Sequence, residues 1–400
     1  MIRPSPILCV VCWGTIASGV VAAPKLFTPD GKVAEASLVS IDTEGQYGFE
    51  IASEKKTLSG GQMVKWGRFV ESRGGAAILT VGGGRIAVNS TGLIGLHTEE
   101  DDLLVDTKLF GSIKIPLDHV VAVVRHSPRD AQRRDRRFAD IRQGKKEADR
   151  VLLDNGDELI GTVLSLNIAA IEMVINDRPT KIEMKRVGAI ALNPALLVKS
   201  ASRRPTWIGF SDGTILPAAT ITGEKGEVRF RVAAKISLSA PLKSITAIQP
   251  SGEKVTYLSD LKPLSYRHIP YLTHAWPYHT DANALGGRLR SGGEVYLKGL
   301  GNHSASRLTY RLPHACHRFE AQLAVDEAAG DRGSVIYRVY THAGKQWKLA
   351  YTSDVVRGGN APITMSVDLT GAKAIALLVD FADRGDEQDL ANWLDARLVK

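Results

Sequence analysis

The clearest hydrophobic pattern lies in the C-terminal third of the chain. Residues 318–325 and 363–369 alternate strictly between apolar and polar positions, which is typical of half-buried antiparallel strands. The apolar positions expected to face inward are Phe319, Ala321, Leu323, Val325, Ile363, Met365, Val367 and Leu369. Residues 374–379 are continuously apolar, as expected for a central strand. Together these runs predict a two-sheet β-sandwich or jelly roll.

A different pattern recurs four times before this region, at residues 27–66, 77–124, 151–194 and 207–250. Each copy opens with a strand, turns at a glycine, continues with a strand and closes with a short apolar phrase. The closing phrases at 117–123, 184–190 and 242–248 resemble one another. Asn155-Gly156 and Asp212-Gly213 predict type I′ hairpin turns, in which both central residues have positive φ. The repeats are therefore expected to be β-rich.

Repeats of this length could be propeller blades or small barrels. The copies share no aromatic signature of the kind that propeller blades repeat, which favours barrels. The phrase at residues 155–163, Asn-Gly-Asp-Glu-Leu-Ile-Gly-Thr-Val, resembles SH3-like or Sm-like small barrels of about five strands. We interpret the repeats as spacers or protein-interaction modules.

A charged segment separates the second and third copies. Residues 128–150 carry nine Lys or Arg and five Asp or Glu, with few apolar residues. We expect residues 127–149 to form an exposed helical linker that separates two pairs of barrels. The alternative is a basic strip that binds an anionic polymer.

The N-terminus has the features of a signal peptide. Arg3 precedes an apolar core at residues 7–21, which is shorter than the roughly 20 residues of a membrane span. The small residue Ala22 predicts cleavage before Ala23. We therefore expect residues 1–22 to be removed and the protein to be secreted or periplasmic. The alternative is an uncleaved N-terminal anchor; no other stretch approaches a transmembrane span.

Composition narrows the function classes. The chain has three cysteines, and cleavage would leave only Cys316, so no internal disulfide is expected. The net charge of +8 favours anionic partners, and export makes nucleic acid the least available of them. The sequence contains no Gly-x-Ser-x-Gly, His-Glu-x-x-His or P-loop motif, and we therefore expect no enzymatic activity.

Several phrases in residues 255–399 resemble one family. They are Tyr257–Leu261, Lys298–Ser306, Leu308–Tyr310 and Asp389–Leu398, and the family is the NPCBM domain, a carbohydrate-binding-type module. The resemblance implies a galactose-binding-like β-sandwich and a glycan ligand. This chain departs from the family at Asn302 and Arg311, changes that would alter a binding surface and not the fold.

Sugar binding needs an aromatic platform and planar polar groups. Trp276, Tyr278, Trp347 and Trp393 are the candidate aromatics. We select Trp347, at a predicted hairpin end, as the ligand-binding ring and expect Trp393 to lie in the core. The candidate polar contacts are Asn302, His303, Asp326 and Arg397.

An acidic loop at residues 382–389 offers a metal site. Asp383, Asp386 and Asp389 supply the hard oxygen ligands that calcium prefers. The family resemblance implies a structural calcium here, although Arg384 would oppose a cation.

The sequence as a whole predicts an all-β protein of tandem small β-barrel-like repeats followed by a β-sandwich. The expected divisions are two repeats at 23–126, the linker at 127–149, two repeats at 150–250 and the sandwich at 251–400. The favoured function is an exported, non-catalytic carbohydrate-binding protein, with a possible protein partner for the repeats. The alternative is a structural or assembly protein outside the cytoplasm, which uses its β-domains for protein contacts.

Overall fold

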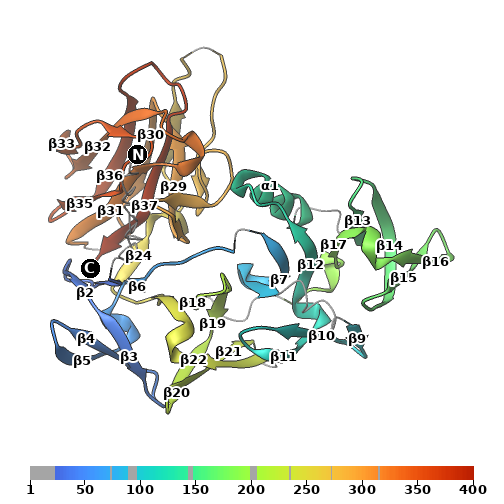
Figure 1. Ribbon diagram of the computed structural model, residues 1–400. Helices are drawn as coiled ribbons and strands as arrows, with labels where there is room; N and C mark the ends of the chain where they lie inside the picture. Colours follow the sequence, from blue (N-terminus) through green and yellow to red (C-terminus); the bar gives the residue numbers. More distant parts are fainter. Residues whose placement is uncertain are drawn as a thin grey trace, which may run out of the picture.

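The structure, a computed structural model, describes residues 23–72, 74–88, 97–142, 147–198, 205–233, 236–271, 273–313 and 316–400. The predicted signal peptide, residues 1–22, lies outside the described residues. Within them the chain is almost wholly β, with one α-helix, α1 (Ala131–Arg142), which confirms the predicted fold class (Figure 1). No helix in the described ranges is long and apolar enough to cross a membrane.

Four β-units precede the C-terminal domain, and we number them 1 to 4 along the chain. Unit 1 contains β1 (Lys25–Phe27), β2 (Val33–Glu35), β3 (Ser37–Ile41), β4 (Tyr47–Ile51), β5 (Glu54–Leu58) and β6 (Lys65–Gly67). Unit 2 contains β7 (Gly75–Thr80), β8 (Arg85–Val88), β9 (His97–Glu99), β10 (Asp102–Thr107), β11 (Gly111–Pro116) and β12 (Val120–Ser127). Unit 3 contains β13 (Asp149–Leu153), β14 (Glu158–Leu166), β15 (Ala170–Ile175), β16 (Arg178–Glu183) and β17 (Val187–Ala191). Unit 4 contains β18 (Thr206–Phe210), β19 (Ile215–Ala218), β20 (Thr220–Glu224), β21 (Glu227–Ala233), β22 (Ile236–Pro241) and β23 (Ile245–Gln249).

Every unit has a 3-10 turn before its last strand, and in units 2 to 4 the strand follows the turn directly. The turns are Gly60–Gln62, Leu117–His119, Met184–Arg186 and Leu242–Ser244. The similar closing phrases of units 2 to 4 each consist of this turn and the start of the strand that follows. Their apolar residues are mostly buried because the last strand lies inside the large sheet.

The hairpin turns at the predicted glycines are present, but they are not type I′. Gly156 has φ of 96° and Gly213 has φ of 87°, whereas neither Asn155 nor Asp212 has positive φ. The reason is loop length: four residues separate β13 from β14, so that a single glycine in the left-handed region closes the loop.

A 14-stranded sheet joins the four units. Its order is β16-β15-β14-β13-β17-β12-β7-β8-β19-β18-β23-β6-β1-β2. Units 2 and 3 meet through their last strands, β12 and β17, and units 4 and 1 meet through theirs, β23 and β6. The expectation that the charged segment separates two pairs of consecutive units is therefore wrong, because the units on either side of it hydrogen-bond to each other.

The helix α1 is not an exposed linker. Phe138 and Ile141 are 3% and 1% exposed and pack with Leu79, Val124 and neighbouring alanines of the sheet. Arg134 and Asp135 on the same side are also buried, because each has a charged partner. Two apolar residues three positions apart are enough to bury one face of a helix that is otherwise highly charged.

The C-terminal domain is a sandwich of two antiparallel sheets. One sheet has the order β26-β29-β37-β31-β35 and the other β25-β30-β36-β32-β33; β24 pairs with β37 and β34 with β32. The strands are β24 (Val255–Tyr257), β25 (Ser265–His268), β26 (His279–Thr280), β27 (Leu289–Ser291), β28 (Glu294–Tyr296), β29 (Gly299–His303), β30 (Ser306–Arg311), β31 (Arg318–Val325), β32 (Ser334–His342), β33 (Trp347–Thr352), β34 (Val356–Arg357), β35 (Ile363–Asp368), β36 (Ala374–Phe381) and β37 (Leu390–Val399).

The alternating pattern located most of this core. The inward positions of β31 and the central position of β36 are confirmed. Ile363 is an exception with 39% exposure, because it begins an edge strand.

The hairpin of β27 and β28 packs against unit 1 and the segment that follows it, and so joins the sandwich to the units. Val295 forms an isolated β-bridge with Phe69, and both side chains are buried. Lys65 of unit 1 is 2% exposed and contacts the carboxylates of Glu294 and Asp395. The units and the sandwich therefore share a buried polar interface.

Candidate functional site

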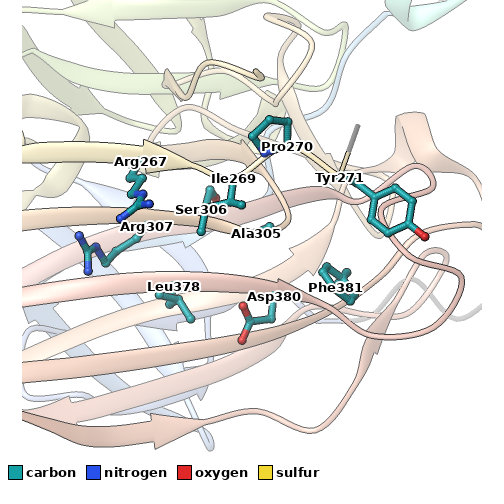
Figure 2. Close-up of a pocket in the computed structure, with 10 residues that line it drawn as sticks. All are labelled: Arg267, Ile269, Pro270, Tyr271, Ala305, Ser306, Arg307, Leu378, Asp380 and Phe381. Carbon is teal, nitrogen blue, oxygen red and sulfur yellow. The ribbon is translucent and has the colours of Figure 1, made fainter. Parts of the chain in front are cut away.

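A pocket of about 470 Å³ lies on the outer face of the sandwich, at one end of β25, β30 and β36 (Figure 2). Three segments far apart in sequence supply its walls. The lining residues are Arg267, Ile269, Pro270, Tyr271, Ala305, Ser306, Arg307, Leu378, Asp380 and Phe381. Its volume is within the range of small-molecule sites.

Strand register sets the polar part of this pocket. Arg267 is paired with Arg307 across β25 and β30, and Arg307 with Leu378 across β30 and β36. Because alternate residues of a strand share one face, Asp380 lies on the same face as Leu378. Asp380 forms an ion pair with Arg338 of β32. The floor therefore carries guanidinium groups and a carboxylate, which can bind hydroxyl groups.

Two aromatic rings stand at the mouth of the pocket. Tyr271 is 63% exposed and Phe381 is 45% exposed. Their ring centroids lie 6.3 Å apart with an interplanar angle of 81°. Figure 2 shows both rings at the same end of the strands, beyond Asp380. Exposed aromatic faces in a concave site can stack against an apolar ligand surface.

A tryptophan–histidine cluster adjoins the pocket. Trp276 stacks on His303 with ring centroids 5.0 Å apart, and His274 packs edge-on against Trp276 at 4.6 Å. His268 Nδ1 accepts a hydrogen bond of 3.3 Å from the Trp276 backbone N–H. The cluster borders the pocket along the chain, because His268 directly precedes the lining residue Ile269, but none of its four rings lines the pocket.

Burial shifts the ionisation of two groups beside this cluster. Burial lowers the pKa of His303 to about 4, while the Asp386 carboxylate opposes the shift. Burial raises the pKa of Asp389 to about 6, although the Ser334 N–H, which donates to Asp389 Oδ1, stabilises the charged form. His303 Nδ1 is buried and has no hydrogen-bond partner among the described residues. The buried imidazole of His303 is therefore neutral at physiological pH.

Trp347, selected from the sequence, lies elsewhere. It is 44% exposed on the edge strand β33, where its ring packs against His342 at 5.0 Å. His342 pairs with Ala374 at the start of β36, whereas the pocket lies at the other end of that strand. Trp347 is thus an exposed aromatic residue at the opposite end of the same sheet.

The four predicted polar contacts do not meet in one open site. Asn302 is 1% exposed and donates from Nδ2 to Ser306 Oγ, and only its neighbour His303 belongs to the cluster beside the pocket. Asp326 is 1% exposed and accepts hydrogen bonds from Asn283, Asn392 and backbone N–H groups. Arg397 is 6% exposed and donates to Glu320 at 2.6 Å. Asp326 and Arg397 therefore act as buried structural groups.

The structure does not gather the carboxylates of the predicted calcium site. Asp383 pairs with Arg357 at 2.7 Å, and Asp389 is fully buried with Oδ1 bound to the Ser334 N–H. Asp386 contributes an electrostatic interaction with His303. In the described part of the chain, no group of three or more His, Cys, Asp or Glu side chains could hold a metal ion. The residues present do not fit a calcium ion, because Asp383 is paired with Arg357 and Asp389 is buried against the Ser334 N–H.

Sequence reasoning missed Tyr271, Phe381, Arg267, Arg307 and Asp380. Phe381 ends β36 just after Asp380, which interrupts the apolar run of residues 374–379, and an apolar residue at a strand end gives no signal of exposure. Trp276 was among the candidate aromatics, but its stacking on His303 depends on a contact between β29 and a loop.

Residues 254–399 match the family model described as the NPCBM/NEW2 domain. The C-terminal sandwich is an NPCBM domain. A protein of Renibacterium salmoninarum named "Putative endo-alpha-N-acetylgalactosaminidase" is 32% identical over 153 residues. These residues are 36% of this chain and 10% of the relative, so the chain spans a small part of that protein's length.

Solved structures similar to this chain include carbohydrate-binding modules. The CBM51 module of Clostridium perfringens GH95, in complex with methyl-galactose, is 24% identical and aligns with 36% of this chain and 99% of that chain, with a TM-score of 0.32. The tandem CBM51 modules of the family 98 glycoside hydrolase from Streptococcus pneumoniae SP3-BS71 are 13% identical and align with 62% of this chain and 87% of that chain, with a TM-score of 0.31.

Proposed function

We propose that this chain is an exported, non-catalytic carbohydrate-binding protein whose NPCBM domain binds a glycan in the pocket of Tyr271 and Phe381. The observation that supports this most is the pair of exposed rings beside a floor of arginine and aspartate side chains. Sugar recognition uses this combination, because the rings contact C–H faces and the planar polar groups bind hydroxyls. The NPCBM family match supports the same ligand class.

The pocket residues have different roles in the proposed binding. Tyr271 and Phe381 supply the stacking surface, and Asp380, held by Arg338, supplies a fixed acceptor. Arg267 and Arg307 supply donors, and they favour glycans that carry acidic groups. His303 is 4% exposed and does not line the pocket, so in this proposal it supports the adjoining cluster and does not contact the glycan.

The β-units serve as a platform in this proposal. They hold the domain through a buried interface and extend away from it. The apolar leader that predicts export would bring the protein to extracellular or periplasmic glycans.

A glycan array screened with the mature chain, residues 23–400, tests the proposal. The array should include terminal galactose and N-acetylgalactosamine, the latter because of the name of the Renibacterium relative. Tyr271→Ala and Phe381→Ala should each weaken binding several-fold or more, since one stacked ring contributes on the order of 1 kcal/mol. Trp347→Ala is the matched control, because it removes an exposed ring at the other end of the same sheet.

Loss of binding in Trp347→Ala with full binding in Tyr271→Ala would move the site to the β32–β33 hairpin. No binding to any glycan would overturn the proposal. Parallel measurements in calcium chloride and in a chelator test the calcium that the acidic loop was expected to hold.

An assembly role is the second candidate, and one cleft favours it. A hollow of about 820 Å³ between units 2 and 3 contains the exposed side chains of Leu164 and Leu196. Exposed apolar residues in a cleft are typical of protein contacts. Sedimentation velocity of the mature chain would show self-association, which Leu164→Asp should abolish if this cleft mediates it.

A further inference from the structure

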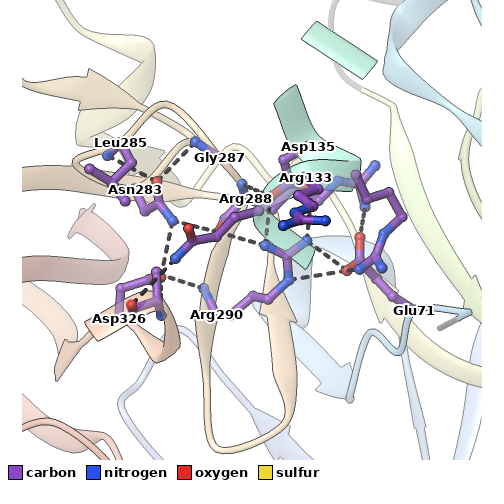
Figure 3. Close-up of polar contacts among 12 residues, drawn as sticks. Glu71, Arg133, Asp135, Asn283, Leu285, Gly287, Arg288, Arg290 and Asp326 are labelled. Atoms are coloured by element: carbon purple, nitrogen blue, oxygen red, sulfur yellow. Dashed lines mark hydrogen bonds and ion pairs between the residues drawn. The ribbon is translucent and has the colours of Figure 1, made fainter. Parts of the chain in front are cut away.

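The interface between the units, α1 and the NPCBM domain contains more buried cations than anions (Figure 3). Four arginine side chains from β8, α1 and the segment around β27 surround two carboxylates. They are Arg85, Arg134, Arg288 and Arg290, and the carboxylates are those of Glu71 and Asp135. Arg288 has a side-chain exposure of 19%, and the other five side chains are exposed by 9% or less.

Both carboxylates are already fully engaged. Glu71 Oε2 accepts from Arg134 at 2.8 Å and from Arg290 at 2.7 Å, and its Oε1 lies 3.2 Å from Arg288 Nη1. Asp135 accepts two hydrogen bonds from Arg290, at 2.6 and 2.9 Å, and one from the Arg288 backbone N–H. Figure 3 shows Arg290 between the two carboxylates.

A third carboxylate beside Arg290, that of Asp326, does not balance the excess. Asp326 binds the backbone N–H of Arg290 and the side chains of Asn283 and Asn392, and it faces away from the Arg290 guanidinium.

Arg85 is the cation of this cluster that has no carboxylate within hydrogen-bond distance. Its side chain is fully buried, and Nε, Nη1 and Nη2 have no hydrogen-bond acceptor among the described residues. Glu71 Oε1 lies 4.0 Å away, beyond hydrogen-bond distance, and the ring of Phe138 lies 5.4 Å from the guanidinium carbon. Burial, followed by repulsion from Arg288, lowers the pKa of Arg85 to about 10. A buried charge without an acceptor is costly unless an anion accompanies it.

We propose that a small inorganic oxyanion of the sulfate or phosphate class binds at Arg85, between α1 and the NPCBM domain. It would accept hydrogen bonds from Arg85 and from Arg134 Nε, which is also buried and without an acceptor in the described ranges. Arg288, the most exposed of the four arginines, marks the side from which an ion enters. A polymer cannot reach Arg85, so the ligand is a free ion and not a sulfated or phosphorylated glycan.

Calorimetric titration of the mature chain with sodium sulfate and sodium phosphate tests the site directly. Arg85→Met keeps an unbranched apolar side chain in place of the aliphatic part of arginine and removes the charge, and it should weaken binding at least about tenfold, because a charge-assisted hydrogen bond is lost. Arg229→Met is the matched control, since Arg229 is exposed on β21 and should leave binding unchanged. If Arg85→Met fails to fold, Arg288→Met replaces it and should also weaken binding.

Thermal melts separate a specific site from a general salt effect. In the wild type the melting temperature should rise with sulfate and reach a plateau, at ionic strength held constant with sodium chloride. An equal rise in Arg85→Met would show a general solvent effect and overturn the proposal, as would the absence of binding heat in the wild type. Dextran sulfate should not reproduce the plateau; if it does so in an Arg85-dependent manner, the free-ion assignment is wrong.

Discussion

Trp276 lies flat against His303, with ring centroids 5.0 Å apart and ring planes 7° apart. The contact joins the loop after β25 to the end of β29 and shields the imidazole, which is 4% exposed. Shielding from water disfavours the imidazolium, which is why burial lowers the pKa of His303 to about 4.

His303→Gln should reduce the loss of stability in acid. The unfolded chain binds a proton at His303 near pH 6.5, whereas the folded protein does so only near pH 4, so acid favours the unfolded state across this window. The wild type should lose up to about 3 kcal/mol more than His303→Gln between these values, since one pKa unit corresponds to about 1.4 kcal/mol. Urea unfolding at several pH values measures the difference, and parallel profiles would contradict it.

Asp389→Asn should change the pH dependence of stability in the opposite direction to His303→Gln. The pKa of Asp389 is raised to about 6 in the folded protein from an ordinary value of 3.8, so its stabilising contribution is present below pH 3.8 and is lost as the pH rises through 6. The variant should therefore be more stable than the wild type near pH 7 and lose this advantage near pH 4. Because the Ser334 N–H donates to Asp389 Oδ1, the amide oxygen of Asn can preserve that bond. A variant less stable at both pH values would refute the prediction.

Trp393→Ala should destabilise the NPCBM domain by roughly 3–5 kcal/mol, because its ring is fully buried and packs edge-on against Tyr337 at 4.8 Å. Trp347→Ala, at an exposed ring, should leave the melting temperature nearly unchanged. Calorimetric melts of both variants make the comparison. An early melt in Trp347→Ala alone would reverse these assignments.

Lys65→Met should destabilise the full chain by roughly 3–5 kcal/mol, because it leaves Glu294 and Asp395 buried together without their cation. Adding Glu294→Gln should recover part of the loss. Lys32→Met is the control, because the Lys32–Asp30 pair is exposed and its removal should not change the denaturant midpoint. Equal midpoints for Lys65→Met and the wild type would show that the interface does not depend on this pair.

Phe138→Ala should lower the free energy of unfolding by roughly 3–5 kcal/mol, since the ring is buried between α1 and the sheet. Arg136→Ala, on the exposed side of the same helix, should have little effect on the free energy of unfolding. If Phe138→Ala leaves the free energy of unfolding unchanged, residues 127–149 would again be interpreted as an exposed linker.

Export predicts a processed N-terminus. Mass spectrometry of protein isolated from outside the cytoplasm should find Ala23 or a nearby residue first, because the apolar core ends just before it. An intact Met1 in a soluble cytoplasmic fraction would disprove this expectation.

The sequence by itself determined the elements of this protein. Period-two alternation placed Phe319, Leu323 and Val367 in the core, since such side chains alternate between the faces of a strand. Glycines such as Gly156 and Gly213 located the hairpins, because their left-handed backbone conformation is a local property. The ordered phrases after residue 255 identified the NPCBM domain.

Only the tertiary structure decided how these elements meet. The pairing of β12 with β17 depends on strand edges that leave no mark on the hydrophobic pattern of either strand. The pocket joins Tyr271 to Phe381 across 110 positions of sequence, through the register of three strands. Arg85 and Arg290 look like surface residues in sequence because charge normally favours water. They are buried because partners from distant segments surround them, and burial depends on those neighbours and not on the residue type.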